Sequence, residues 1–197
     1  MDQELEKHKR LRLAQKANAD SHHHPAEKIE QLISLGDLIH GDILEVFAGA
    51  GNLTEWYRQK GSVTAMNKAE FGDSFDAIYR LRADCKKYDV IDIDSYGYPD
   101  KFFPVVFELM KPQTTLIFTF PMVGAQCLNG ITEMHYVTFW RSNRPSLGDV
   151  VGGITDMAMR EWIIPSLIDI RKIKPILRFA FMCKKHKATE MCNVRNR

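Results

Sequence analysis

The chain lacks the cysteine patterns that stabilise small secreted proteins. Its four cysteines, Cys85, Cys127, Cys183 and Cys192, are scattered, and none forms a C-x-x-C pair. This spacing indicates neither a zinc site nor a disulfide framework. No apolar stretch is long enough to cross a bilayer, and the N-terminus is charged where a signal peptide would be apolar. We therefore expect a cytoplasmic protein that uses no metal and no membrane.

A strong net charge is also lacking. The 197 residues carry a formal net charge of +2, so no global field indicates a polyanionic partner. Basic residues gather instead near the ends, at 7–12 and 184–187 and at Arg195 and Arg197. Such clusters bind phosphates in some proteins and are solvated surface in others, and both alternatives stay open. We expect a polar extension over 1–20, one domain over 21–185 and a basic tail over 186–197.

A third glycine is missing from the most informative stretch, which reads DILEVFAGAGNLT over residues 42–54. A dinucleotide-binding G-x-G-x-x-G would place glycine at position 54, where threonine stands. The apolar run 43–47, the sequence Gly49-Ala50-Gly51 and the polar Asn52 predict a buried strand, a tight turn and a helix start. Glycines let a backbone approach a nucleotide-like ligand closely. An ordinary strand-to-helix turn is the alternative.

Strands and helices alternate along the chain. We predict helices at 25–35, 52–60, 99–110 and 149–164, a partly helical stretch at 70–80, and strands at 43–47, 63–66, 88–94, 114–120, 166–171 and 176–182. Alternation of this kind favours a mainly parallel sheet covered by helices. The short connection 172–175 between the last two strands favours an antiparallel hairpin at the C-terminal end.

Two acids close the predicted strand that begins at residue 88, where the sequence reads YDVIDIDSYGYP. Asp92 and Asp94 are two residues apart, so they share one face of the strand. Asp94 lies where the strand ends. Ligands of open α/β sheets bind beyond the carboxyl ends of the strands. We therefore expect residues 94–97 to face the same crevice as Gly49 and Gly51.

These stretches resemble the S-adenosylmethionine (SAM)-dependent methyltransferases. Glu45 followed by the sequence FAGAG is similar to their motif I, and residues 92–99 resemble the D-x-D-P-Y-G-x-P run of the tRNA guanine-N2 methyltransferases, with Ser95 in place of proline. Residues 24–28, HPAEK, resemble the H-P-x-x-K-P segment of DNA amino-methyltransferases, with Ile29 in place of the second proline. The resemblance implies an α/β, Rossmann-like methyltransferase fold and SAM as cofactor.

The resemblance also implies roles for matching residues. In the acceptor site, Asp94 and the backbone at Ser95 would accept hydrogen bonds from an exocyclic amine and could receive its proton, and Tyr96 or Tyr98 would stack on the base. Glu70 would hold the ribose and Asp84 the adenine, although ordinary surface positions are the alternative for Asp84. The full set implied to bind the cofactor is His24, Pro25, Glu45, Phe47, Gly49, Gly51, Asn52, Glu70, Asp84 and Asp92.

The sequence thus predicts a SAM-dependent N-methyltransferase that acts on an exocyclic amino group of a base in RNA or DNA. Arg141, Arg144 and the basic termini are the candidate nucleic-acid contacts. One alternative is a methyltransferase for a protein or a small molecule, because a fold does not set its substrate. The other is a degenerate methyltransferase-fold binding module, which Lys68 and Ser95 favour. The sequence indicates no oligomeric state.

Overall fold

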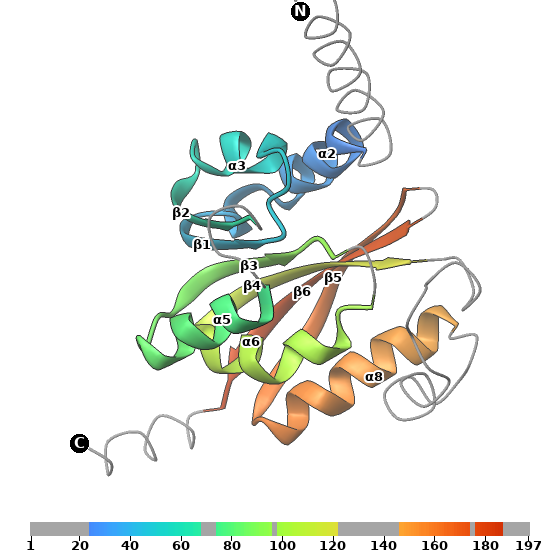
Figure 1. The fold of residues 1–197 in the computed structure, drawn as a ribbon. Coiled ribbons are helices and arrows are strands. Elements are labelled where there is room, and N and C mark those ends of the chain that lie inside the picture. The colour runs from blue at the N-terminus through green and yellow to red at the C-terminus, as the bar shows by residue number, and fades with distance from the viewer. Residues whose placement is uncertain (1–23, 68–73, 96–97, 122–145, 174–175, 187–197) are drawn as a thin grey trace, which may run out of the picture.

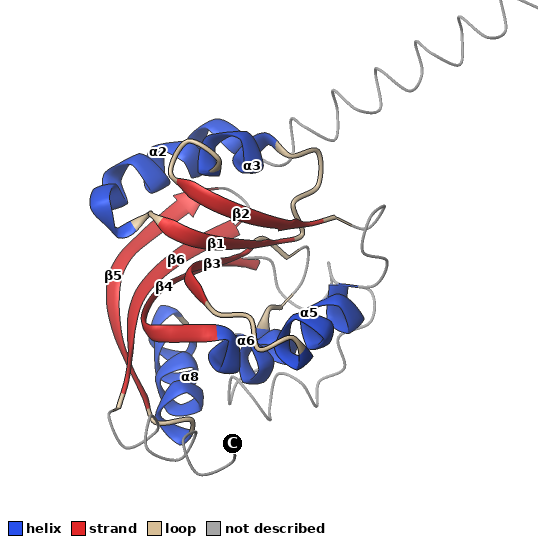
Figure 2. Ribbon diagram, turned by 90° about the vertical axis from the view of Figure 1, so that its left-hand side faces the viewer, coloured by secondary structure: helices blue, strands red, loops and turns tan. Residues whose placement is uncertain are grey.

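The computed structural model describes residues 24–67, 74–95, 98–121, 146–173 and 176–186. These residues form one six-stranded sheet with helices on both faces (Figures 1 and 2). The strands are β1 (Gly41–Val46), β2 (Gly61–Met66), β3 (Tyr88–Ile93), β4 (Met110–Pro121), β5 (Ile163–Ile173) and β6 (Ile176–Lys185). The helices are α2 (Pro25–Leu35), α3 (Asn52–Tyr57), α5 (Ser74–Ala83), α6 (Phe103–Leu109) and α8 (Leu147–Arg160), with 3-10 turns η1 (Gly36–Leu38) and η2 (Asp100–Phe102).

The sheet has the predicted plan. Its strand order is β2-β1-β3-β4-β6-β5, and β1 to β4 pair in parallel. β6 lies between β4 and β5 and is antiparallel to both. Because β1 and β3 are parallel neighbours, their carboxyl ends meet at one edge of the sheet. The predicted ligand-binding segments follow these two strands.

Each face of the sheet buries its own apolar cluster. Helices α2 and α3 cover one face, and α5, α6 and α8 cover the other (Figure 2). Alternate residues of a strand point to opposite faces, so Ile43 packs under α2 and α3 while Leu44 packs on the far side. The α2 face includes Leu32, Leu35, Ile43, Leu53, Val90 and Ile117. The broader α6 face is rich in aromatic rings, which include Phe103, Phe107, Phe118, Phe179 and Phe181.

One predicted boundary is wrong for a clear steric reason. The helix predicted at 52–60 ends at Tyr57, and the strand predicted at 63–66 already begins at Gly61, as β2. A Cβ atom on Gly61 would lie 1.9 Å from the carbonyl oxygen of Gly41. The glycine is therefore needed for the close approach of β1 and β2, a contact that local sequence does not reveal.

Other helix boundaries differ from the predicted ones because apolar residues are common in buried strands as well as in helices. The helix expected to reach residue 164 ends at Arg160, and Trp162 has a positive φ of 58° that turns the chain into β5 at Ile163. Met110, expected as a helix end, begins β4. The partly helical stretch is α5, which starts at Ser74 and ends at Ala83. No helix within the described ranges is long and apolar enough to cross a membrane.

Candidate functional site

The glycine turn follows β1 at the carboxyl edge of the sheet. Phe47, Gly49 and Gly51 have φ angles of 69°, 54° and 85°. The amide of Ala48 donates to the carbonyl oxygen of Met66 at 3.0 Å, and the amide of Gly51 donates to that of Ala48 at 2.8 Å. Positive φ is strained at a phenylalanine. The Phe47 ring packs edge-on against Phe102, with centroids 5.2 Å apart, which helps to hold this conformation.

Within the described part of the chain, the outer side of this turn is open. There a Cβ atom on Gly49 would meet only the carbonyl oxygen of Phe47, at 3.8 Å. At Gly51 it would meet, of the same residues, only the side chain of Thr54, at 3.8 Å and beyond. Both glycines thus leave bare backbone where a ligand can approach closely. Asn52, the first residue of α3, is exposed beside the turn.

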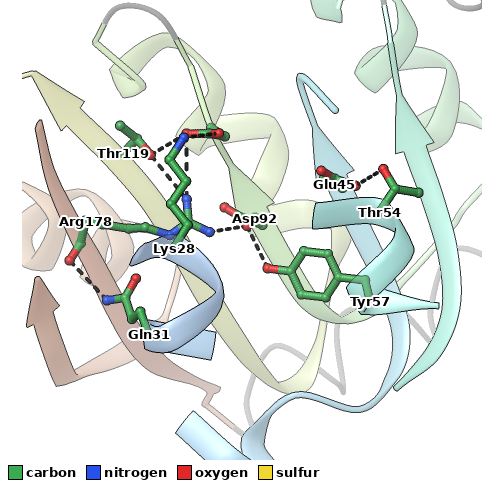
Figure 3. A network of polar contacts seen from close by, with 9 residues as sticks. Lys28, Gln31, Glu45, Thr54, Tyr57, Asp92, Thr119 and Arg178 are labelled. Atoms are coloured by element: carbon green, nitrogen blue, oxygen red, sulfur yellow. Dashed lines mark hydrogen bonds and ion pairs between the residues drawn. The ribbon is translucent and has the colours of Figure 1, made fainter. Parts of the chain in front are cut away.

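The acid at the end of β3 lies next to the glycine turn. The amide of Asp94 donates to the carbonyl oxygen of Val46 at 3.2 Å, which joins the ends of β3 and β1. The Asp94 carboxylate accepts hydrogen bonds from Lys28 Nζ at 2.5 Å and Thr119 Oγ1 at 2.6 Å. Figure 3 labels both donors. Arg178 Nη1 lies 3.7 Å from the same carboxylate. Asp94 is therefore held from α2, β4 and β6 at once.

Asp92 forms the buried half of this network. Its carboxylate is paired with the Arg178 guanidinium and accepts a hydrogen bond from the Tyr57 hydroxyl at 2.6 Å. Arg178 Nη1 also donates to Thr119 Oγ1 at 3.2 Å. The side chains of Asp92 and Arg178 are 0% exposed, so Asp92 lies behind Asp94 rather than in an open cleft. Binding of the cofactor by Asp92 stays a prediction.

The pKa values of the two aspartates are shifted in opposite directions. Burial raises the pKa of Asp92, although Arg178 opposes this shift. Burial also acts to raise the pKa of Asp94, but Arg178 and Lys28 outweigh it and the pKa is lowered. Asp94 is thus an ionised carboxylate with weak affinity for a proton.

Glu45 supports the turn from behind. It pairs in register with Asp92 across β1 and β3 and is 1% exposed. Its carboxyl accepts a hydrogen bond from Thr54 Oγ1 at 2.5 Å, which ties β1 to the first turn of α3. Burial, with a smaller contribution from Asp92, raises the pKa of Glu45 to about 8. At neutral pH it is an uncharged acid, and a direct ligand contact stays a prediction.

The start of α2 lies beside this network. His24, with φ 49°, precedes the helix and its Nδ1 lies 3.2 Å from a carboxylate oxygen of Glu27. Pro25 is the first helical residue. One turn later, Lys28 reaches Asp94. The structure therefore brings the HPAEK segment and the end of β3 together.

The structure places Asp84 away from the predicted cofactor site. The short run 81–83 before it is the last turn of α5, and Leu81 packs against the core. Asp84 is exposed between α5 and the start of β3, so it lies at the edge opposite the carboxyl ends. Ser95 follows Asp94 and is buried. Glu70, Tyr96, Arg141, Arg144, the basic cluster at 7–12, and Lys187, Arg195 and Arg197 lie outside the described residues, whereas Lys184 and Lys185 end β6.

Sequence reasoning missed four members of the network: Thr54, Tyr57, Thr119 and Arg178. One signal was available, since Arg178 is the single charge within the apolar strand run 176–182. A lone charge in a buried strand needs a partner. Among the described residues, no three His, Cys, Asp or Glu side chains are grouped to hold a metal ion.

No protein-family model and no curated protein matches the chain. Among solved structures, it is similar to Trm1 from Pyrococcus horikoshii in complex with S-adenosyl-L-methionine, with 14% identity and a TM-score of 0.59 over 77% of this chain. It is also similar to a Streptococcus thermophilus protein described as a candidate hemolysin, with 14% identity and a TM-score of 0.51 over 81% of this chain. The match spans 53% of Trm1 and 64% of the second protein. The chain has a Rossmann-like methyltransferase fold, as the sequence predicted.

Proposed function

We propose that the chain is a SAM-dependent N-methyltransferase that acts on an exocyclic amino group of a nucleic-acid base. The observation that carries this proposal is the adjacency of the open glycine turn and Asp94. They follow neighbouring parallel strands and are linked by the 3.2 Å hydrogen bond from the Asp94 amide to Val46. The likeness to Trm1, which was solved with SAM, supports the same choice of cofactor.

The glycine turn fits the proposed cofactor. The bare backbone at Gly49 and Gly51 would hold SAM, with His24 and Pro25 at the start of α2 nearby and Glu70 as the proposed ribose partner. SAM supplies a methyl group on a positively charged sulfur, which keeps the C–S electron pair when the acceptor nitrogen forms its bond to the methyl carbon. This chemistry needs no metal, so most of the acceleration can come from alignment of the two reactants.

Asp94 would orient the acceptor amine. The lone pair of an amine on a base is delocalised into the ring, and oxygen acceptors around the N–H groups favour a more tetrahedral nitrogen. Because Lys28 and Arg178 keep the pKa of Asp94 low, its carboxylate accepts a hydrogen bond but takes up a proton poorly. The proton lost by the methylated nitrogen would therefore pass to water.

The aromatic partner of the base is proposed to be Tyr96. Tyr98, the other tyrosine in residues 94–99, is 6% exposed and packs on Phe120 with ring centroids 5.0 Å apart. Its ring therefore belongs to the core. Arg141 and Arg144 are the proposed contacts to nucleic-acid phosphates or bases.

Transfer of label from radioactive SAM tests the proposal. The purified chain would be incubated with duplex DNA, single-stranded DNA, bulk tRNA, ribosomal RNA and total protein. We expect label on a base nitrogen in a nucleic-acid fraction. Asp94→Asn should lose at least about tenfold in transfer while its SAM affinity stays within about threefold, since the amide cannot replace a charged acceptor. Asp169→Asn is the matched control, because Asp169 lies on β5 and contacts Gln31 and Arg171 instead.

Two outcomes would support other functions. Label only in protein or in a small-molecule fraction would favour a methyltransferase for those substrates. SAM binding without any transfer would favour the degenerate binding module, which has one observation in its support. Lys28 and Thr119 already contact the two oxygens of Asp94 in the absence of an acceptor.

A further inference from the structure

Lys28 is a buried lysine that has no part in the proposed binding of SAM at the glycine turn. It lies on α2 and its side chain is 4% exposed, an unusual position for an ammonium group without a partner. Its Nζ donates to Asp94 Oδ2 at 2.5 Å across a separation of 66 residues. The contact is therefore tertiary, and α2 places a full positive charge beside Asp94, the residue proposed to orient the acceptor amine.

The charges that face Asp94 are balanced without a substrate. Lys28 comes from α2 and Arg178 from β6, while Asp92 lies on β3, the strand that ends just before Asp94. Two cations thus meet two carboxylates. Glu45, on neighbouring β1, adds no charge at neutral pH because burial raises its pKa to about 8. Thr119, from β4, adds only a neutral hydroxyl donor.

We infer that Lys28 is a positioning residue that holds the Asp94 carboxylate ionised and oriented, and that this pairing selects an uncharged acceptor amine. The reference to an acceptor rests on the proposed function. A cationic amine, such as a lysine or arginine side chain, would add an unmatched charge to a buried and already balanced cluster, at a large desolvation cost. An uncharged base amine would donate to Asp94 without that cost.

Removal of Lys28 should reverse this preference. Without the ammonium, Asp92, Asp94 and Arg178 carry a net negative charge, which would attract a cation. Gln31 provides a matched control one turn along α2. Its Nε2 donates to Asp169 Oδ2 at 3.1 Å and to the carbonyl oxygen of Arg178 at 3.2 Å, so it docks the same helix without touching the Asp94 carboxylate.

Carboxyl carbon NMR of the full chain, labelled with ¹³C at aspartate, tests the inference. Asp94→Asn identifies the resonance. In the wild type, Asp94 should titrate below the usual range of an aspartate. In Lys28→Met its proton affinity should rise at least about tenfold, or one pKa unit, whereas Gln31→Met should leave it unchanged and Lys28→Arg should keep it low.

Several results would overturn the inference. If the pKa of Asp94 in the wild type lies in the usual range of an aspartate, the inference is wrong, and this result does not require Lys28→Met to fold. Equal shifts of the Asp94 pKa in Lys28→Met and Gln31→Met would show that Lys28 acts only by holding α2 in place. A high pKa in Lys28→Arg would show that charge is not the cause.

Methylammonium chloride, compared with sodium chloride, tests the selection of uncharged amines. The Asp94 resonance should respond at least about threefold more strongly in Lys28→Met than in the wild type, since only the variant has an unmatched anion. An equal response would refute the selectivity. These readouts use neither SAM nor methyl transfer, so a chain that fails to bind SAM would refute the proposed function and leave them intact.

Discussion

Replacement of Arg178 with methionine should destabilise the fold by about 3–5 kcal/mol, because it leaves a buried carboxylate without its counter-charge. Asp92 and Arg178 are both fully buried and pair directly between β3 and β6. Methionine approximates the volume of the arginine stem, so the loss of packing is small. The Tyr57 hydroxyl, 2.6 Å from Asp92, would remain as a neutral donor and cannot balance the charge.

A double-mutant cycle separates charge from packing. Asp92→Asn alone leaves Arg178 unpaired and should also be costly, whereas the combination with Arg178→Met removes both charges. Replacement of a whole buried pair by uncharged groups is often tolerated. The double variant should therefore be more stable than the sum of the single effects by about 2 kcal/mol.

The destabilisation should depend on pH. Burial already raises the folded-state pKa of Asp92, and loss of Arg178 raises it further. A carboxyl whose folded pKa is raised contributes stability that is present below its unfolded pKa and lost as pH rises through the folded pKa. Urea unfolding should thus show a smaller difference between Arg178→Met and the wild type near pH 5 than near pH 8. A difference under about 1 kcal/mol at both pH values would refute the reasoning.

Two further predictions concern the sheet around the site. Glu45→Gln should gain stability relative to the wild type, by about 1 kcal/mol or more, as pH rises from 5 to 8. The reason is that the wild-type acid, with a pKa of about 8 in the folded state, increasingly destabilises the fold over this range. Parallel urea titrations at both pH values measure the difference, and a difference that does not change with pH would contradict the prediction. Gly61→Ala should cost more than about 2 kcal/mol, because its Cβ would lie 1.9 Å from Gly41 O. Gly152→Ala, in α8 with no atom of the described residues within 4 Å of the new Cβ, should instead stabilise by about 0.5–1 kcal/mol, and thermal unfolding of both variants measures the two effects.

The sequence predicted the sheet because its signals are local. The apolar run before Gly49 and the acid pair Asp92 and Asp94 each identify a strand and its end within a few residues. Parallel pairing then places both ends at one edge without further information. The short connection before β6 likewise sufficed to predict the antiparallel hairpin.

The charge network was not predictable because it depends on distant pairing. Arg178 meets Asp92 across 86 residues, and only the insertion of β6 beside β4 brings them together. Lys28 was noted for its place in HPAEK, but nothing in that segment indicates its contact with Asp94. The inference for Asp84 was local, but the run of three residues before it is too short to distinguish a strand end from a helix end.

The most direct test of the account is where SAM binds. Amide NMR of the ¹⁵N-labelled chain during titration with SAM should show shifts at Gly49, Gly51 and Ser95, at the carboxyl edge of the sheet. Gly41 and Gly61, which pair at the opposite edge, should not move. No shifts at millimolar SAM, or shifts centred on Gly41 and Gly61, would contradict the assignment of this edge as the cofactor site.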